Sequence, residues 1–313
     1  FSYYGKMDWL FYDRLNITGG LRWEDNDQKV NTFKDNLPTT ARLNRIDMLP
    51  SATATLFITD KQQLRAGYSQ TLSRPDFREL SIAPFTDINT NQETIGNPNL
   101  KQTKITNWDL RWEYYLSPTE NIFAGFFWKD LTQPIELIAQ PGTGALNTYQ
   151  NASKAHVYGF EWEILKKLDF VHPQLQNFYV GGNYTWSQSN VDLTAQNLIV
   201  QTTNHRPLQG HSEHIVNFQL GYDNPKWKTQ ATLLYNVSSK RIMAAGVQTA
   251  PDKYEQPVHQ LDFVLSQNVY KGLSAQLSAQ NLLDDEIRIT QGDEIARQYR
   301  RGRFFNLSVR LAY

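Results

Sequence analysis

Two histidines three residues apart come closest to a metal-binding motif. His211 and His214 form an H-x-x-H pair, but no glutamate follows the first histidine as it does in zinc metalloproteases. The segment also starts a predicted strand, in which residues i and i+3 face opposite sides. We therefore predict no metal site and no cofactor, and we place His205-Arg206-Pro207 on a loop surface rather than in a catalytic site.

Carboxylates recur two residues apart and could supply acid–base chemistry. Glu161 and Glu163 share one face of a predicted strand, as do Asp109, Arg111 and Glu113. The same pattern arises where charges face water inside a barrel or pair with neighbouring strands. We favour this structural interpretation, because ion-pair networks also perturb pKa values. No serine lies in a G-x-S-x-G motif, and we predict no catalytic residue and no enzyme.

Two long predicted loops are candidates for ligand contact. The loop 74–102 carries Phe77, Phe85 and Asn89, and function concentrates in long loops. The last loop is rich in charged residues. It could form a ligand vestibule or ordinary surface ion pairs that add little to stability. Its charged residues are Asp284, Asp285, Glu286, Asp293, Glu294, Arg297, Arg300, Arg301 and Arg303. Individual ligand-binding residues are not predicted.

Composition narrows the class of protein. The 313 residues hold 31 Lys+Arg and 31 Asp+Glu, so no net charge attracts nucleic acid, and they hold no cysteine. The mean hydropathy is −0.56, and no apolar run approaches the ~18 residues of a membrane helix. A membrane β-barrel remains compatible, because only alternate residues of its strands are apolar.

Apolar and polar residues alternate with a period of two, which indicates β-strands. Between 106 and 116, one face reads Thr106, Trp108, Leu110, Trp112, Tyr114 and Leu116, and the other reads Asn107, Asp109, Arg111, Glu113 and Tyr115. A soluble sandwich also alternates. The predicted strands, however, run about 10–14 residues rather than the usual ~5–6. Aromatic residues also cluster toward strand ends, as in the girdles of membrane barrels.

About thirteen strands follow from this pattern. They are 1–11, 14–25, 43–59, 63–73, 103–116, 120–131, 155–168, 177–189, 212–222, 227–238, 258–268, 272–282 and 302–313. Short links alternate with long ones, and only 169–176 is intermediate. The long links are 26–42, 74–102, 132–154, 190–211, 239–257 and 283–301. Outer-membrane barrels have short periplasmic turns and long extracellular loops, so the predicted fold is a transmembrane antiparallel up-and-down β-barrel.

The strand count predicts that residues 1–313 are the C-terminal portion of a barrel domain. Bacterial single-chain barrels have even strand numbers, and the chain opens at Phe1 without a leader. A plugged transporter barrel of about 22 strands would hold about nine more strands and its plug upstream.

Several stretches resemble TonB-dependent receptors in their order and spacing. They are Arg65 to Leu80 with its Ser73-Arg74-Pro75, Gly96-Asn97-Pro98-Asn99-Leu100, Thr106 to Leu110, Pro134-Ile135-Glu136, Gly159-Phe160-Glu161, Asn281-Leu282-Leu283-Asp284 and Arg301-Gly302-Arg303. The resemblance implies a 22-stranded barrel with an N-terminal plug and a TonB-box, neither of which lies in this sequence. It also implies energised import at the Gram-negative outer membrane through the inner-membrane TonB complex. The final strand, ending at Tyr313, resembles the signal read by the barrel-assembly machinery.

The expected function is active import of a scarce solute, with outer-membrane lipids around the barrel. Siderophore-iron, cobalamin, oligosaccharide and peptide all stay open as the solute. The alternative is a passive porin. A barrel protease or lipase and a soluble β-sandwich binding module are less compatible with the sequence. The presence of a lipoprotein lid and the oligomeric state are not predicted.

Overall fold

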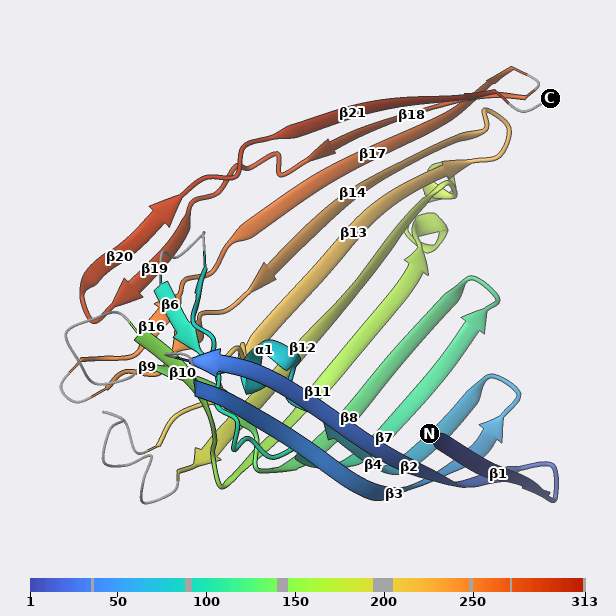
Figure 1. The fold of residues 1–313 in the computed structure, drawn as a ribbon. Helices are drawn as coiled ribbons and strands as arrows, with labels where there is room; N and C mark the ends of the chain where they lie inside the picture. Colours follow the sequence, from blue (N-terminus) through green and yellow to red (C-terminus); the bar gives the residue numbers. More distant parts are fainter. Residues whose placement is uncertain are drawn as a thin grey trace.

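Thirteen antiparallel strands form one large sheet in the computed structural model, which describes residues 1–34, 37–87, 92–139, 146–193, 205–247, 250–270 and 272–311 (Figure 1). In spatial order the strands are β1 (Ser2–Phe11), β2 (Leu15–Lys34), β3 (Leu37–Thr59), β4 (Gln62–Ser73), β7 (Thr103–Ser117), β8 (Glu120–Thr132), β11 (Lys154–Lys167), β12 (Phe178–Asp192), β13 (His214–Asn224), β14 (Thr229–Ser238), β17 (His259–Tyr270), β18 (Leu273–Gln280) and β21 (Phe304–Leu311). The order in space is the order in sequence, so the sheet is an up-and-down meander. Each of the thirteen predicted strands has its counterpart, and the predicted all-β fold is confirmed.

The register keeps apolar residues on one face from strand to strand. On β13, Phe218 lies opposite Gly182 of β12 and Tyr235 of β14, and Leu220 lies opposite Val180 and Leu233. Phe218 and Leu220 are exposed, as expected of side chains that face lipid. At one end of this face, aromatic rings pack between strands, with 4.5 Å between the Tyr68 and Trp108 centroids and 5.2 Å between those of Trp128 and Tyr158. Ring contacts of this kind are expected at the interfacial girdle of a membrane barrel.

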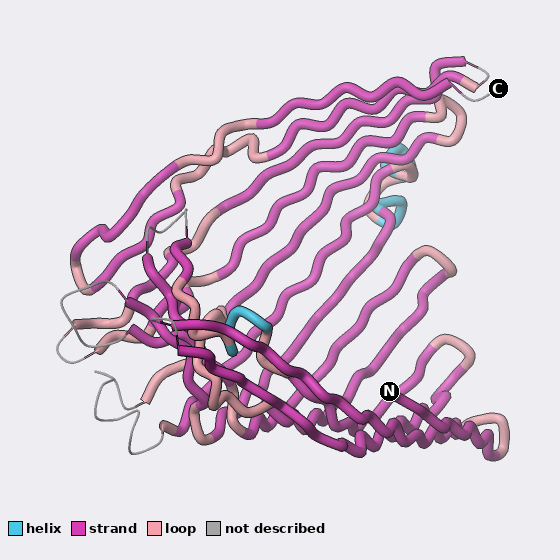
Figure 2. Tube along the Cα trace, viewed as in Figure 1, coloured by secondary structure: helices cyan, strands magenta, loops and turns pink. Residues whose placement is uncertain are grey.

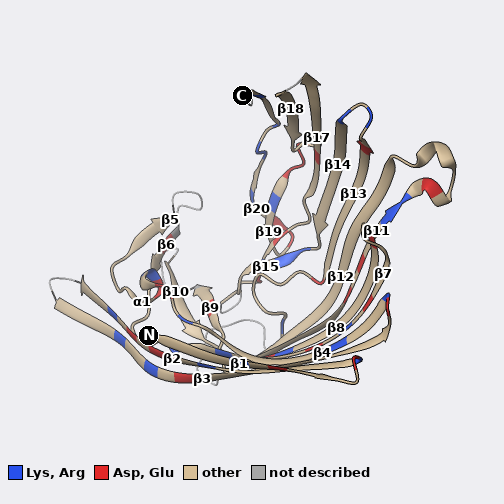
Figure 3. Cartoon of the chain, turned by 90° about the vertical axis from the view of Figure 1, so that its right-hand side faces the viewer, with Lys and Arg blue, Asp and Glu red and all other residues tan. Residues whose placement is uncertain are grey.

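The opposite, polar face lines the concave side of the sheet. Figure 3 shows the sheet curving as a trough, with α1 (Phe77–Leu80), β9 (Ile135–Ala139) and β10 (Leu146–Asn151) inside it. Leu80 of α1 packs against Ala41 of β3, which shares a face with Asp47. The neighbouring residues Ile46 and Met48 are exposed on the convex side. The sheet does not close, because β1 and β21 are its two edges.

The connections sort by length between the two ends of the sheet (Figure 2). One end has tight turns, such as Tyr12-Asp13, whose φ angles of 50° and 54° fit a type I′ hairpin turn. The intermediate link there holds two short 3₁₀ turns, η1 (Leu168–Phe170) and η2 (Pro173–Leu175). No helix among the described residues is long and apolar enough to cross a membrane.

The long connections at the other end form two further sheets that the sequence did not predict. One consists of β5 (Phe85–Asp87), β6 (Gln92–Ile95), β10 (Leu146–Asn151) and β9 (Ile135–Ala139), and the other of β15 (Arg241–Ala244), β16 (Lys253–Glu255), β19 (Ile287–Gln291) and β20 (Glu294–Tyr299). A single parallel bridge between Ile138 and Ala245 joins them. Pairing of this kind satisfies the backbone polar groups of long loops.

The prediction of a loop over 26–42 was wrong. β2 continues to Lys34 and β3 starts at Leu37, with pairing from Asn26↔Arg45 to Lys34↔Leu37. The last strand begins at Phe304 rather than at the predicted 302, and its described part ends at Leu311. Tyr313 lies outside the described residues.

Candidate functional site

A recess of about 640 Å³ lies where the loop sheets meet the inner wall of the large sheet. It receives charged side chains from separate connections, namely Arg74, Asp76, Glu79, Glu136, Arg241 and Glu255. Apolar side chains such as Leu131, Ile135 and Leu208 lie between them. A concave site that mixes apolar surface with a few convergent polar groups is suited to ligand binding.

Arg74 is anchored to the wall by acidic residues of two strands. Its Nη2 donates to Glu24 Oε2 at 2.8 Å and lies 3.8 Å from Asp47 Oδ2. Asp47 is buried, and Gln102 donates to both of its carboxylate oxygens at 2.8 Å. Gln28 donates to the carbonyl of Pro75 at 2.8 Å. The Ser-Arg-Pro stretch is therefore a fixed corner at which β4 leaves the wall.

A one-turn helix follows this corner and is fixed by its cap. Asp76 accepts from the Arg78 N–H at 2.9 Å, and Glu79 accepts from the Asp76 N–H at 2.9 Å. Burial raises the pKa of Glu79 above its ordinary value. The capping box is the local reason why these residues turn back toward the wall.

The Gly-Asn-Pro stretch docks on the same helix. Gly96 N–H donates to the Ser81 carbonyl at 2.8 Å, and Asn97 Nδ2 donates to the Tyr149 carbonyl at 3.0 Å. A Cβ at position 96 would lie 2.4 Å from the carbonyl oxygens of Arg78 and Ser81. Only glycine permits this approach.

A buried ion pair links two connections that are distant in sequence. Arg206 Nη1 and Nη2 donate to Glu136 Oε1 and Oε2 at 2.9 and 2.8 Å, and these residues are only 3% and 4% exposed. Next to them, Gln209 Oε1 accepts from the Leu137 N–H at 2.9 Å and Gln209 Nε2 donates to the Met243 carbonyl. The prediction that Arg206 lies on a loop surface was wrong.

The two histidines of the H-x-x-H pair make separate contacts. Both ring nitrogens of His211 contact serine hydroxyls, Nε2 with Ser187 at 2.8 Å and Nδ1 with Ser189 at 2.9 Å. His214 instead lies 2.8 Å from the Tyr184 hydroxyl. β13 begins at His214 rather than at the predicted 212, and His211 lies in the segment before it. Among the described residues, no group of three His, Asp or Glu side chains is placed to hold a metal ion.

The contact of Ser187 with His211 has the spacing of a nucleophile–base pair, but not its surroundings. Ser187 is buried, and a serine rather than a carboxylate contacts the second ring nitrogen of His211. Burial lowers the pKa of His211, and the nearby Glu213 opposes this effect. The cluster therefore fastens the segment before β13 to β12.

The paired carboxylates of the wall join an ion-pair network. Arg111 Nε lies 3.2 Å from Glu113 Oε1, and its Nη2 lies 3.5 Å from Glu163 Oε2. Glu161 and Glu163 line a smaller recess of about 160 Å³ beside Arg111. These contacts agree with the structural interpretation of the pattern.

The predicted loop contacts are only partly brought to the recess. Phe77 is exposed, Arg78 lies over the Phe85 ring at 5.6 Å, and Asn89 is outside the described residues. In the last loop, Asp284 accepts from the Gly302 N–H and Asp285 from the His259 N–H, both at 2.9 Å. Its one ion pair among the described residues is Glu286–Arg288 at 2.7 Å, so these charges mostly stabilise the loop itself.

Sequence analysis missed Arg241 and Glu255 of the recess and the pairing of Glu136 with Arg206. Arg241 makes a bidentate contact with Glu255 at 2.9–3.1 Å across β15 and β16. One signal was available, because Glu136 is a single charge in the apolar run Ile135 to Ile138. A lone charge in such a run indicates a buried partner.

A curved sheet of long strands, apolar outside and polar inside, defines the chain as wall of a transmembrane β-barrel. The family model described as TonB dependent receptor-like, beta-barrel, matches residues 1–282. The chain belongs to this family. No curated protein sequence matches it.

Solved structures with the same fold include two siderophore-related receptors and a copper transporter. They are the siderophore receptor PirA from Pseudomonas aeruginosa (16% identity, TM-score 0.61, 99% of this chain and 47% of that chain), the ferric yersiniabactin uptake receptor FyuA from Yersinia pestis (16%, 0.68, 99% and 45%) and the copper transporter OprC (18%, 0.68, 100% and 47%). At these identities the likeness shows the fold alone. The chain spans less than half the length of each.

Gly96→Ala tests the docking of the Gly-Asn-Pro stretch. The added methyl must displace the carbonyls of α1, at a cost of about 1–3 kcal/mol. We expect faster amide hydrogen exchange at Asn97 and Leu80, measured by mass spectrometry on the full-length receptor. Gly5→Ala is the control, since a Cβ there meets no atom within 4 Å. Equal exchange in both variants would contradict the tight approach.

Glu136→Gln tests the buried ion pair. Removing one partner of such a pair costs about 3 kcal/mol, so hydrogen exchange at Leu137 should accelerate about 100-fold. The control is Asp27→Asn, which breaks the exposed bidentate pair with Arg42 and should leave hydrogen exchange at Leu137 nearly unchanged, because water screens exposed ion pairs. Comparable effects of the two changes would show that the buried pair does not hold the loops together.

Lowering the pH should loosen the segment before β13. Burial lowers the pKa of His211 while its segment is packed against β12, which we call the closed form. In the open form, with the segment released, His211 binds a proton at a higher pH than in the closed form. The closed form is therefore favoured above the ordinary histidine pKa of about 6.5 and is weakened as the pH falls through that value. Limited proteolysis between pH 8 and pH 5 should show this change in the parent and in a His205→Gln control but not in His211→Gln. A pH response that persists in His211→Gln would assign it to another group.

Proposed function

We propose that this chain is the C-terminal portion, over 1–313, of the barrel domain of an active outer-membrane receptor that imports a scarce solute. The observation that carries the proposal is the recess of about 640 Å³ at the loop end of a wall that is polar on its concave side. A solute that binds there lies directly above the polar lumen. Family membership over residues 1–282 supports the same function.

The fixed loops suit a receptor better than an open pore. Arg206–Glu136, Arg74–Glu24 and Arg241–Glu255 hold the charged groups around the recess in place. Preorganised polar groups favour binding, because little is lost in ordering them. A ferric siderophore or copper complex is the first solute class to test, since the structural neighbours carry those names. Cobalamin, oligosaccharide and peptide are the others.

The remaining partners follow from the family. Energy would come from the inner-membrane TonB complex, which acts on an N-terminal plug encoded upstream. The exposed apolar face of Phe305, Leu307 and Val309 suits both outer-membrane lipid and the barrel-assembly machinery in a Gram-negative cell. We propose no enzymatic activity, because the serine–histidine contact lacks an orienting acid.

Uptake by the full-length gene product tests the proposal. Cells lacking other receptors would be given cationic, neutral and anionic ferric siderophores, Cu²⁺, cyanocobalamin, a maltooligosaccharide or an oligopeptide, with and without a protonophore. We expect saturable binding of one probe and accumulation that stops when the proton gradient collapses. Passive flux that is linear in concentration and unaffected by the protonophore would instead show that the protein is a passive porin.

A further inference from the structure

A row of side chains in direct register crosses eight strands of the polar face. Seven strand pairings connect its members in turn. The row is Gln63, Glu113, Phe123, Glu163, Asn183, Asn217, Asn236 and Gln260. Apart from Phe123, every member carries an amide or a carboxylate.

The row climbs from one rim of the wall to the other. Gln63 is the second residue of β4, just after a tight turn, and Gln260 is the second residue of β17, just after a long loop. The cause is the strand tilt of about 35–45° in membrane barrels, which makes a row perpendicular to the strands rise. Seven steps of about 4.8 Å give a climb of about 20 Å. This rise approaches the ~25 Å apolar band of such barrels.

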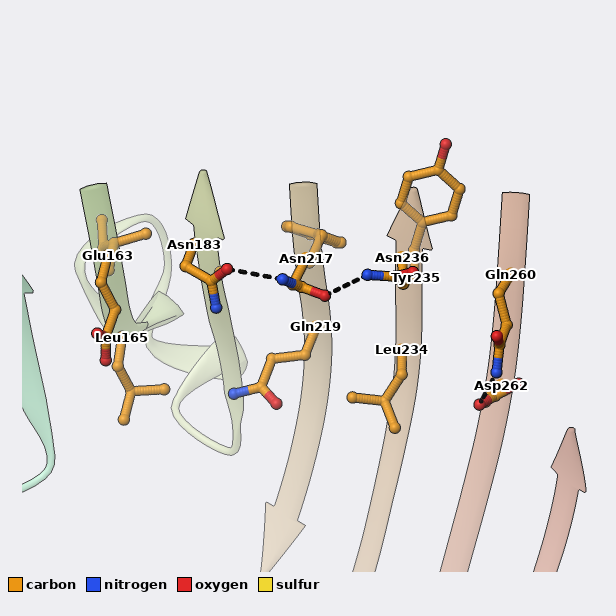
Figure 4. Close-up of a pocket in the computed structure, with 13 residues that line it drawn as sticks. Glu163, Leu165, Asn183, Asn217, Gln219, Leu234, Tyr235, Asn236, Gln260 and Asp262 are labelled. Atoms are coloured by element: carbon orange, nitrogen blue, oxygen red, sulfur yellow. Dashed lines mark hydrogen bonds between the residues drawn. The ribbon is translucent and has the colours of Figure 1, made fainter. Parts of the chain in front are cut away.

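The upper part of the row is a ladder of carboxamides (Figure 4). Asn217 Nδ2 donates to Asn183 Oδ1 at 2.7 Å, and Asn236 Nδ2 donates to Asn217 Oδ1 at 2.5 Å. A carboxamide has two N–H donors and two acceptor sites. Asn217 therefore keeps one N–H and one lone pair for a molecule in the lumen.

The lower part carries charge that is balanced within the wall. Gln63 donates to Glu113, and the Arg111 guanidinium lies between Glu113 and Glu163. The same guanidinium lies 4.4 Å from the Phe123 ring centroid, so it covers the apolar member of the row. Polar groups thus continue from Gln63 to Glu163.

The ladder lines a recess of about 250 Å³, and the charges around this recess select the charge of a solute that enters it. Among the described residues that line it, Asp262 is acidic and makes no ion pair, Glu163 lies 3.5 Å from Arg111 Nη2, and none is basic. Anions are disfavoured in such surroundings, whereas neutral and cationic groups are not.

We propose that this row is a track along which a neutral or cationic, hydrogen-bonding solute passes through the lumen. The proposal rests on the proposed transport function and adds the path and the chemical class of the solute. Every step except the one at Phe123 offers an amide or a carboxylate, and neighbouring strands lie about 4.8 Å apart. Repeated weak sites of this kind allow a solute both to bind and to move on.

Single cysteines in the full-length receptor test the track, because residues 1–313 contain no native cysteine. Any cysteine upstream is first replaced by serine. The variants Gln63→Cys, Asn217→Cys and Asn236→Cys sample the row, and Phe218→Cys is the matched control on the lipid face beside Asn217. The probes are methanethiosulfonates with a neutral hydroxyethyl, a cationic trimethylammonioethyl or an anionic sulfonatoethyl group, added to intact cells with the proton gradient on and off. Heat-modifiable migration in gels checks that each variant is folded.

We expect all three row positions to react with the neutral reagent in at least one gradient state. After correction for intrinsic reactivity, the cationic reagent should react about tenfold faster than the anionic one at Asn217→Cys and Asn236→Cys, while Phe218→Cys stays inert to both. Row positions that are inert in both states in a folded receptor would overturn the track and identify a packing surface for another part of the protein. An equal or faster anionic reaction would overturn the solute class. Neither result depends on substrate uptake, so the failure of this proposal is distinguishable from failure of the transport function.

Discussion

The pairing of neighbouring strands along the whole sheet is the constraint on which the rest of this structure depends. In hydrocarbon no water can satisfy a backbone N–H or carbonyl, so each must be paired within a sheet. Because side chains alternate along a strand, a shift of one residue would move every polar group to the lipid side. In the register of β13 with β14, Phe218 lies opposite Tyr235 on the lipid face and Asn217 lies opposite Asn236 on the polar face. One register therefore aligns the apolar and the polar side chains together.

This constraint explains why the wall could be predicted from sequence and the loops could not. Alternation is local, so segments such as 106–116 reveal strand and facing together. Above the bilayer both faces of a hairpin meet water, and the alternation fades where pairing continues. That is why β2 was predicted to end too early and β3 to begin too late, although Asn26 to Lys34 remain paired with β3.

The candidate site depends on contacts that no local pattern encodes. Glu136 and Arg206 are 70 residues apart, and Arg74 meets Glu24 across 50. Arg206 was predicted to lie on a loop surface, because charged residues are rarely buried unless they are paired. Its partner, Glu136, belongs to another loop and is not visible in the local sequence. The motif stretches around Arg74 and Gly96 were recognised as a family resemblance, but their roles as a wall corner and a docking point required the structure.

The recess and the wall row differ in the strength of their interactions, and the difference fits their places along the lumen. Around the recess, charged groups are fixed in pairs such as Arg206–Glu136, and rigid charged groups favour retention of a ligand. Along the ladder, the contacts are single amide hydrogen bonds, each worth about 1 kcal/mol net. A solute must leave each position of a passage, so strong sites there would slow it. Fixed charged groups at the mouth and weak repeated contacts along the wall would therefore suit the proposed capture and passage of a solute.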